Sequence, residues 1–157
     1  MSRFSLAGKR AFVTGANTGI GQAIAVDLAR HGAHVIAVGR SSMDETLEAV
    51  GETGGCADPL KADLGTVAEA VGAFEAARDR FGPIDTLVNN AGIIRRADSL
   101  DFTEADWDAV MEINLKVVFF LSQAFARARI AAGQGGSIVH IASLLAFQGG
   151  IRIPSYT

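Results

Sequence analysis

A glycine-rich turn between an apolar run and an amphipathic pattern constrains this chain more than any other feature. Residues 14–21 read TGANTGIG and directly follow the β-type run at residues 10–14. After the turn, Ile20, Ile24 and Leu28 recur at helical spacing with Ala23 beside them, which predicts one apolar helix face. A strand that enters a helix through glycines offers unpaired N–H groups and a positive dipole end to a pyrophosphate. The turn therefore predicts a dinucleotide site, although any tight strand-to-helix connection also uses glycine.

β-type runs alternate with helical patterns along the chain. We expect strands at residues 10–14, 33–38, 84–88 and 137–142, and a weaker one near residues 56–61. We expect helices at residues 19–31, 43–51, 66–81, 103–111 and 114–132. This alternation predicts an α/β fold, a Rossmann-like doubly wound parallel sheet with helices on both faces. Neither a repeat nor a linker interrupts the pattern, so residues 1–157 are interpreted as a single domain.

Composition and charge narrow the classes of partner. The 157 residues are 49% apolar and 20% charged, a globular balance, and the net charge of −3 comes without a basic cluster, which argues against nucleic acid. No run reaches the ~18 apolar residues of a membrane span, and the first ten residues lack a signal-peptide pattern. The lone Cys56, which we expect to be a buried small residue, fits a reducing, cytoplasmic location. No set of His, Cys, Asp and Glu has metal-ligand spacing, so we expect no metal, and His140 is interpreted as a packed or hydrogen-bonded core residue.

Three further positions favour a cofactor at the glycine turn, whose spacing is G-x-x-x-G-x-G. Asp63 follows the third expected strand, where its carboxylate could accept from an adenine amino group or could cap a helix. Asn90, Ala91 and Gly92 follow the next strand, and their small size lets a sugar or nicotinamide lie against the backbone, although such residues also suit an ordinary turn. Arg40 ends the second strand without a neighbouring acid, which suits the 2′-phosphate of NADP, although an arginine can stack on the adenine of either cofactor.

The residues expected to contact NAD or NADP lie in the glycine turn and at the ends of the following strands. They are Gly15, Asn17, Thr18, Gly19, Ile20, Gly21, Arg40, Asp63, Leu64, Asn90, Ala91 and Gly92.

The ordered motifs together resemble the short-chain dehydrogenase/reductase family. They are the TGxxxGIG turn at residues 14–21, the NNAG run at residues 89–92, Asn114, Ser143 and Tyr156. The resemblance implies an NAD(P)-dependent oxidoreductase. Within the family, residues 93–96 and 147–156 resemble the 2-deoxy-D-gluconate 3-dehydrogenase group, also described as 2-dehydro-3-deoxy-D-gluconate 5-dehydrogenases. That group moves a hydride between a nicotinamide cofactor and a hydroxyl or ketone of a sugar acid.

The resemblance also implies roles for single residues. Tyr156 would be the base, Ser143 would hydrogen-bond the substrate oxygen, and Asn114 would hold a water in a proton relay. Taken one by one, these residues also fit a surface aromatic, a strand-end hydroxyl and a helix cap. Within the family the phenol is assisted by a lysine four residues beyond the tyrosine, whereas this chain ends at Thr157.

Three polar residues are candidates for substrate recognition. Arg95 and Arg152 could each pair with a sugar-acid carboxylate, and Gln148 could contact a hydroxyl. Solvated surface arginines are the alternative.

The end of the chain at Thr157 also bears on the fold and on activity. Family members continue through further strands, so we expect a C-terminally incomplete sheet whose last strand is an exposed edge, and we expect the activity of this polypeptide to be doubtful. A homo-oligomer, a tetramer, is expected for a full-length form. The alternatives are another short-chain reductase, such as a 3-oxoacyl-carrier-protein reductase, or an inactive nucleotide-binding fragment.

Overall fold

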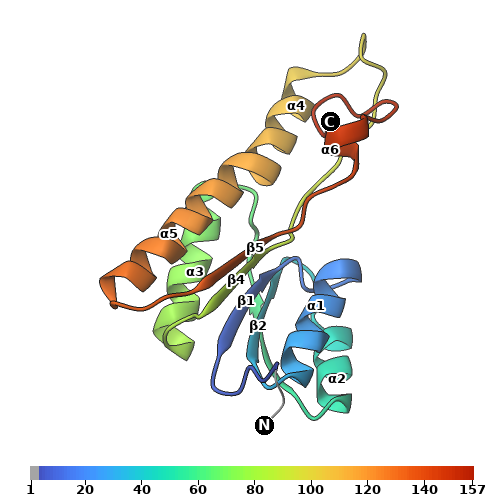
Figure 1. Ribbon diagram of the computed structural model, residues 1–157. Coiled ribbons are helices and arrows are strands. Elements are labelled where there is room, and N and C mark those ends of the chain that lie inside the picture. Colours follow the sequence, from blue (N-terminus) through green and yellow to red (C-terminus); the bar gives the residue numbers. More distant parts are fainter. Residues whose placement is uncertain (1–3) are drawn as a thin grey trace.

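Five parallel strands form one sheet in the computed structural model, which describes residues 4–157 (Figure 1). The spatial order is β3-β2-β1-β4-β5, and every neighbouring pair is parallel. The strands are β1 (Arg10–Thr14), β2 (His34–Gly39), β3 (Cys56–Lys61), β4 (Thr86–Asn89) and β5 (Ser137–His140). The predicted Rossmann-like parallel sheet is therefore confirmed. Pro59 fits within β3 because that strand lies at the edge of the sheet.

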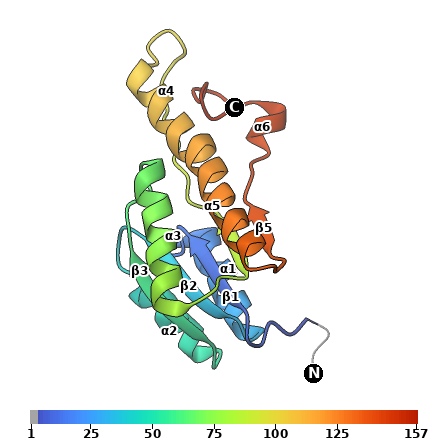
Figure 2. The same ribbon diagram turned by 90° about the vertical axis from the view of Figure 1, so that its left-hand side faces the viewer.

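Helices cover both faces of the sheet (Figures 1 and 2). The helices α1 (Gly19–Arg30) and α2 (Asp44–Glu52) lie on one face, and α3 (Val67–Phe81) lies with the long C-terminal helix on the other. Neighbouring residues of β1 point to opposite faces, so Phe12 packs with the core on the α3 side and Val13 with the core on the α1 side. Because both faces are buried, the inner strands are continuous apolar runs.

The predicted apolar face of α1 is confirmed only in part: Ile24 and Leu28 are partly buried against the core on this side of the sheet, whereas Ile20 and Ala23 are exposed. Its buried residues are Gly21, Ala25 and Ala29, whereas Ile20 is 63% exposed beside the carboxyl end of the sheet. Small side chains let the helix approach the strands closely. A prediction based on the spacing of large apolar residues does not detect this kind of packing. The predicted cap of α3 is confirmed, because the Thr66 hydroxyl accepts from the Glu69 backbone N–H at 3.3 Å.

The two helices predicted on either side of residue 112 form one continuous rod, so the predicted break is wrong. Its segments are α4 (Glu104–Met111), the π-helical η1 (Glu112–Val117) and α5 (Val118–Ala131). No Gly or Pro separates the two patterns, and a π turn absorbs the change of phase instead. The 28-residue rod is long and apolar enough to cross a bilayer by length and composition alone, a test that core helices of soluble proteins also pass. Its buried residues Val117, Leu121 and Phe125 belong to the core on the α3 side.

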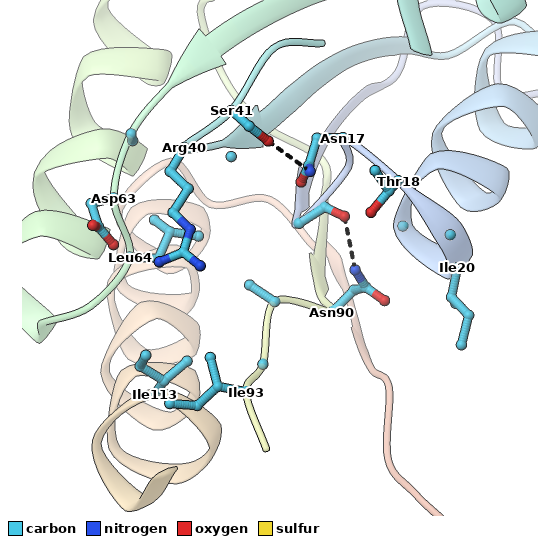
Figure 3. A pocket seen from close by; sticks show the side chains of 17 residues that line it. Asn17, Thr18, Ile20, Arg40, Ser41, Asp63, Leu64, Asn90, Ile93 and Ile113 are labelled. Carbon is cyan, nitrogen blue, oxygen red and sulfur yellow. Dashed lines mark hydrogen bonds between the residues drawn. The ribbon is translucent and has the colours of Figure 1, made fainter. Parts of the chain in front are cut away.

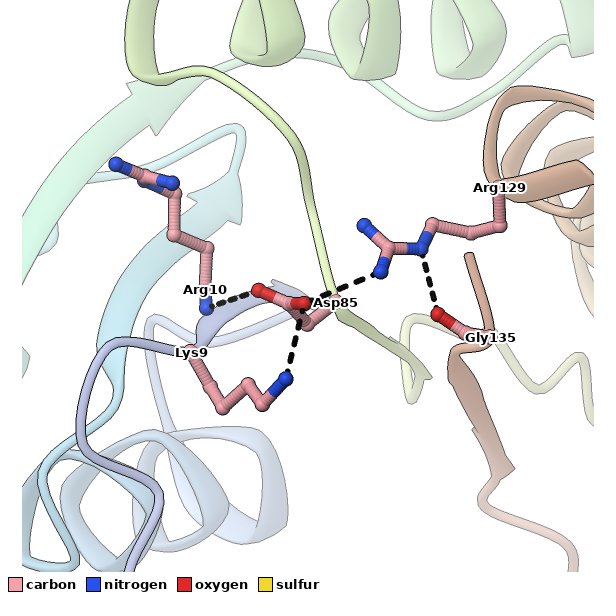
Figure 4. A network of polar contacts seen from close by, with 5 residues as sticks. All are labelled: Lys9, Arg10, Asp85, Arg129 and Gly135. Atoms are coloured by element: carbon pink, nitrogen blue, oxygen red, sulfur yellow. Dashed lines mark hydrogen bonds and ion pairs between the residues drawn. The ribbon is translucent and has the colours of Figure 1, made fainter. Parts of the chain in front are cut away.

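A polar network ties together the amino ends of the central strands (Figure 4). The carboxylate of Asp85, just before β4, accepts from the Arg10 backbone N–H at 3.0 Å and from Arg129 of α5 at 3.3 Å. Lys9 lies 3.5 Å from the same carboxylate, and Arg129 also donates to the Gly135 carbonyl at 2.8 Å. This network joins β1, β4, α5 and the entry to β5.

The last strand is an edge with an exposed apolar face, as expected. Val139 and Ile141, which point to the same face, are 43% and 37% exposed, Ile138 on the opposite face is 38% exposed, and β5 ends at His140, before the predicted boundary. His140 is hydrogen-bonded, but it is exposed and therefore not a core residue as predicted. Beyond β5, the chain forms the short helix α6 (Leu145–Gln148), which was not predicted. Cys56 is exposed, so its predicted burial is also wrong: it begins an edge strand.

Candidate functional site

A cavity of about 680 Å³ opens at the carboxyl ends of the strands (Figure 3). It lies where the strand order reverses between β1 and β4, which is the usual ligand position in open α/β sheets. Every residue predicted to contact the cofactor lines it. The lining comprises Gly15, Asn17, Thr18, Gly19, Ile20, Gly21, Gly39, Arg40, Ser41, Ala62, Asp63, Leu64, Asn90, Ala91, Gly92, Ile93 and Ile113.

The glycine turn leaves the start of α1 open to a ligand. Gly15 and Gly19 adopt positive φ values of 63° and 58°, which side chains with a Cβ rarely accept. A Cβ on Gly21 would collide with the backbone oxygen of Gly15, so this glycine permits close contact between helix and turn. The cap residue Thr18 makes no side-chain hydrogen bond to the helix, and the first turn carries no acidic residue. The amino end of α1 is thus free to receive an anion.

A threonine that sequence reasoning did not propose as a site residue joins the turn to the end of β4. The buried Thr14 hydroxyl accepts from the backbone N–H groups of Asn90 and Ala91 at 2.9 and 3.0 Å and donates to the Val88 carbonyl at 3.1 Å. The Asn90 amide donates in return to the carbonyls of Thr14 and Gly15, at 2.9 and 3.2 Å. The sequence signal for this role of Thr14 was its position at the end of a strand, just before the first glycine.

The end of β2 forms the opposite side of the cavity. Figure 3 shows Arg40 extending into it from the strand end. Among residues 4–157, no carboxylate lies within ion-pairing distance of Arg40. Asn17 donates to the Ser41 hydroxyl at 2.9 Å, so the glycine turn and the β2 end are joined across the cavity wall. Asp63 accepts from the Gly65 backbone N–H at 3.0 Å and does not cap a helix, because α3 is capped by Thr66.

The three catalytic candidates lie outside the cavity lining. Asn114 sits in the π segment, where its side chain accepts from the Ile93 N–H at 2.9 Å and donates to the Ile93 carbonyl at 2.8 Å. This pair of bonds joins the long helix to the cavity wall, since Ile93 lines the cavity. Ser143 follows β5, and its hydroxyl accepts from the Leu145 N–H at 3.2 Å. Tyr156 is half-buried near the C-terminal end.

Both arginines proposed for the substrate are engaged in ion pairs. The Nε of Arg95 lies 3.3 Å from Asp106, and the Nε of Arg152 lies 3.0 Å from Asp98. Arg152 has a φ of 64°, and its carbonyl accepts from the Ala97 N–H at 3.1 Å, so it joins the C-terminal segment to the loop before α4. Gln148 is exposed at the end of α6.

The order of the parallel sheet and the glycine turn at its switch point define a protein of the Rossmann-like, nucleotide-binding class. The chain belongs to the short chain dehydrogenase family, whose model matches residues 9–157.

Several relatives carry sugar-acid names. The 2-dehydro-3-deoxy-D-gluconate 5-dehydrogenase of Escherichia coli (strain K12) is 50% identical over 157 residues, covering 100% of this chain and 62% of that protein. The gluconate 5-dehydrogenase of Gluconobacter oxydans (strain 621H) is 46% identical over 149 residues, covering 90% of this chain and 56% of that protein.

Among solved structures, one named as a 2-deoxy-D-gluconate 3-dehydrogenase from Agrobacterium tumefaciens, with bound NADP, is 54% identical with a TM-score of 0.88. The match covers 99% of this chain and 61% of that one. A 3-oxoacyl (acyl-carrier-protein) reductase from the same organism is 30% identical with a TM-score of 0.90, over 98% of this chain and 59% of that one. The chain thus spans about three fifths of the length of the relatives that it matches.

Proposed function

We propose that this chain is the cofactor-binding part of an NAD(P)-dependent oxidoreductase that acts on a sugar acid. The observation that carries the proposal is the cavity at the switch point, walled by an uncapped helix amino end and by glycines that a Cβ would strain or block. The residues fit a dinucleotide. The start of α1 would hold the pyrophosphate, Asp63 would accept from the adenine, and Ala91 and Gly92 would lie along the nicotinamide half.

NADP is the cofactor that the charges of the cavity favour. Arg40 enters the cavity without an acidic partner among the described residues, and its guanidinium suits a 2′-phosphate. With NAD, which lacks the 2′-phosphate, Arg40 could only stack on the adenine.

Three side chains of this chain would have separate roles in the proposed reaction. When bound, the nicotinamide supplies the hydride acceptor or donor. Tyr156 would exchange a proton with the reacting hydroxyl, and Ser143 would donate a hydrogen bond to the substrate oxygen. Asn114, held by Ile93 in the π segment, would orient a water in the proton path.

The sugar-acid carboxylate needs a cation near the reacting carbon. Arg95 and Arg152 remain the candidates, and each would exchange its present aspartate partner for the substrate. Gln148 would contact a hydroxyl. The full-length form would be a cytoplasmic homotetramer, which agrees with exposed Phe119 and Phe120 on the long helix. Sedimentation of the chimera described below tests the tetramer.

Calorimetric titration of the chain with NADPH and NADH tests the cofactor proposal. We expect NADPH to bind more tightly, and Arg40→Ala to weaken it about tenfold to a hundredfold while NADH binding stays nearly constant. A charge-assisted hydrogen bond is worth about 1.5–3 kcal/mol, which corresponds to that range. Arg30→Ala, an exposed arginine of α1, is the matched control. Equal losses for both cofactors would contradict the assignment of NADP.

A chimera tests the reaction itself. Residues 1–157 would be joined to the C-terminal remainder of the Escherichia coli relative, which supplies the length that the match leaves uncovered. We expect turnover of a 2-deoxy-D-gluconate or 2-dehydro-3-deoxy-D-gluconate substrate and little of a β-ketoacyl thioester, with loss of turnover in Tyr156→Phe. The reverse preference would favour the acyl-reductase alternative. Binding without turnover in the 157-residue chain alone would fit an inactive fragment.

A further inference from the structure

Two neighbouring asparagines at the end of β4 form hydrogen bonds toward opposite sides of that strand. Asn90 reaches toward β1, where its amide donates to the carbonyls of Thr14 and Gly15. Asn89 reaches the other way, and its Nδ2 donates to the Ser122 hydroxyl of α5 at 3.0 Å and to His140 Nδ1 of β5 at 3.1 Å. Asn89 is only 4% exposed, so both hydrogens of its amide need partners within the protein.

The directions of these bonds fix the state of the imidazole. The Ser122 hydroxyl donates to the Val118 carbonyl at 2.6 Å, and its oxygen is therefore free to accept from Asn89. The Asn89 amide nitrogen can only donate, so Nδ1 of His140 is the acceptor of this bond and the ring proton lies on Nε2. Asn89, which contacts the ring from β4, and Ser122 of α5, which contacts Asn89, are both uncharged. Within residues 4–157, no acidic or basic side chain forms an ion pair with the ring.

His140 stands where β5 ends and the segment that carries Ser143 begins. The Ile141 N–H donates to the Asn89 carbonyl at 2.9 Å, which is the last backbone bond that holds this segment to β4. Among the strands of residues 4–157, β5 pairs with β4 alone, and none of these strands fixes its other side. The Asn89–His140 bond is thus the side-chain tie between the cavity turn and the segment that leads to Ser143.

We propose that His140 is a positioning residue: as the Nε2–H tautomer it accepts from Asn89 and sets the place of Ser143 relative to the turn at residues 90–92. The proposal deepens the proposed function and rests on it for the role of Ser143. Asn90 thus joins the glycine turn to the end of β4, Asn89 joins β4 to His140, and from His140 the backbone leads to the proposed catalytic serine.

The test uses the 157-residue chain without any cofactor. Long-range proton–nitrogen NMR spectra of the histidine rings at pH 8 report which nitrogen carries the proton, and we expect Nε2 for His140. Amide hydrogen exchange at Ile141 and Leu145 reports the end of β5 and the Ser143 turn. We expect His140→Leu to speed exchange at both amides about tenfold, which corresponds to about 1.4 kcal/mol, the upper part of the range for a net hydrogen bond.

Two further variants separate positioning from general packing. His140→Asn should restore exchange to within about threefold of the wild type, because its Oδ1 occupies the place of the imidazole Nδ1 and accepts the same bond. Val139→Ala alters the same edge strand without touching the bond, and it should also stay near the wild type. A proton on Nδ1, or an asparagine variant that behaves like the leucine variant, would overturn the proposal.

The outcome remains decisive if the leucine variant does not fold, because the wild-type tautomer and the asparagine variant are read independently. Failure of the chain to bind NADPH would reject the proposed function and leave the tautomer and exchange results unaffected.

Discussion

At the scale of single residues, one hydroxyl joins the glycine turn to the turn that follows β4. Thr14 is 2% exposed and makes three hydrogen bonds, two of them to the backbone of the turn after β4. β1 and β4 are adjacent in the sheet but not in the sequence, so this hydroxyl joins segments that lie far apart along the chain. It holds the Asn90–Ala91 backbone against the glycine turn.

Replacing Thr14 by valine should therefore damage both stability and binding. Valine keeps the shape but leaves the N–H groups of Asn90 and Ala91 without their acceptor. We expect the free energy of unfolding to fall by about 2–3 kcal/mol, as measured by urea denaturation, with weaker NADPH binding in addition. Thr14→Ser keeps the hydroxyl and should lose no more than about 1 kcal/mol. Equal losses in the two variants would show that the methyl group, not the hydroxyl, matters.

At the scale of elements, the π segment η1 lets the long helix formed by α4, η1 and α5 contact both the core near α3 and the wall of the cavity. On one side Val117 and Leu121 pack into the core near α3, and on the other side Asn114 binds the backbone of Ile93. A regular α-helix would have advanced these side chains by a different rotation. The segment η1 therefore sets the direction in which Asn114 points, and π turns of this kind are frequent at functional sites.

Removing the side chain of Asn114 should loosen the wall of the cavity. Asn114→Ala deletes two hydrogen bonds to Ile93, and we expect a loss of about 1–3 kcal/mol in the free energy of unfolding with faster amide exchange at Ile93. Asn114→Asp retains the acceptor for the Ile93 N–H and should keep that amide protected. An alanine variant as stable and as protected as the wild type would contradict this role.

At the scale of the whole molecule, Asp85 closes the end of the sheet that lies away from the cavity. Its carboxylate meets the backbone of Arg10 and the side chain of Arg129, which is only 10% exposed. This network thus joins β1 and β4 at their amino ends (Figure 4), and the bonds of Thr14 join the same two strands at their carboxyl ends.

Removal of the Asp85 side chain should destabilise the whole fold. Asp85→Ala leaves the nearly buried Arg129 without its carboxylate, and we expect a loss of about 3 kcal/mol in the free energy of unfolding. Asp27→Ala breaks ion pairs on the surface of α1, where both side chains of the Arg30–Asp27 pair are about 60% exposed, and should cost below about 1 kcal/mol. The midpoints of urea denaturation measure both. Similar midpoints for the two variants would show that the network adds nothing to stability.

Local patterns were enough to predict the strands, the sheet class and the residues around the cavity. Gly15, Arg40, Asp63 and Asn90 all follow strands, and parallel strands bring their carboxyl ends to one edge. Sequence patterns gave wrong predictions where tertiary packing determined the local structure. The buried side of α1 uses Gly21 and alanines, and the break expected near residue 112 became a π turn.

By itself, the sequence determined the order of the elements, the glycine turn and the chemistry of the side chains at the strand ends, because each depends on short stretches of chain. The folded structure was needed to show that Thr14 hydrogen-bonds the Asn90 turn, that Asp98 and Asp106 form ion pairs with the candidate arginines, and that Asn89 bonds His140. Such bonds join residues distant in sequence, and their geometry is fixed only when the sheet and the long helix pack together.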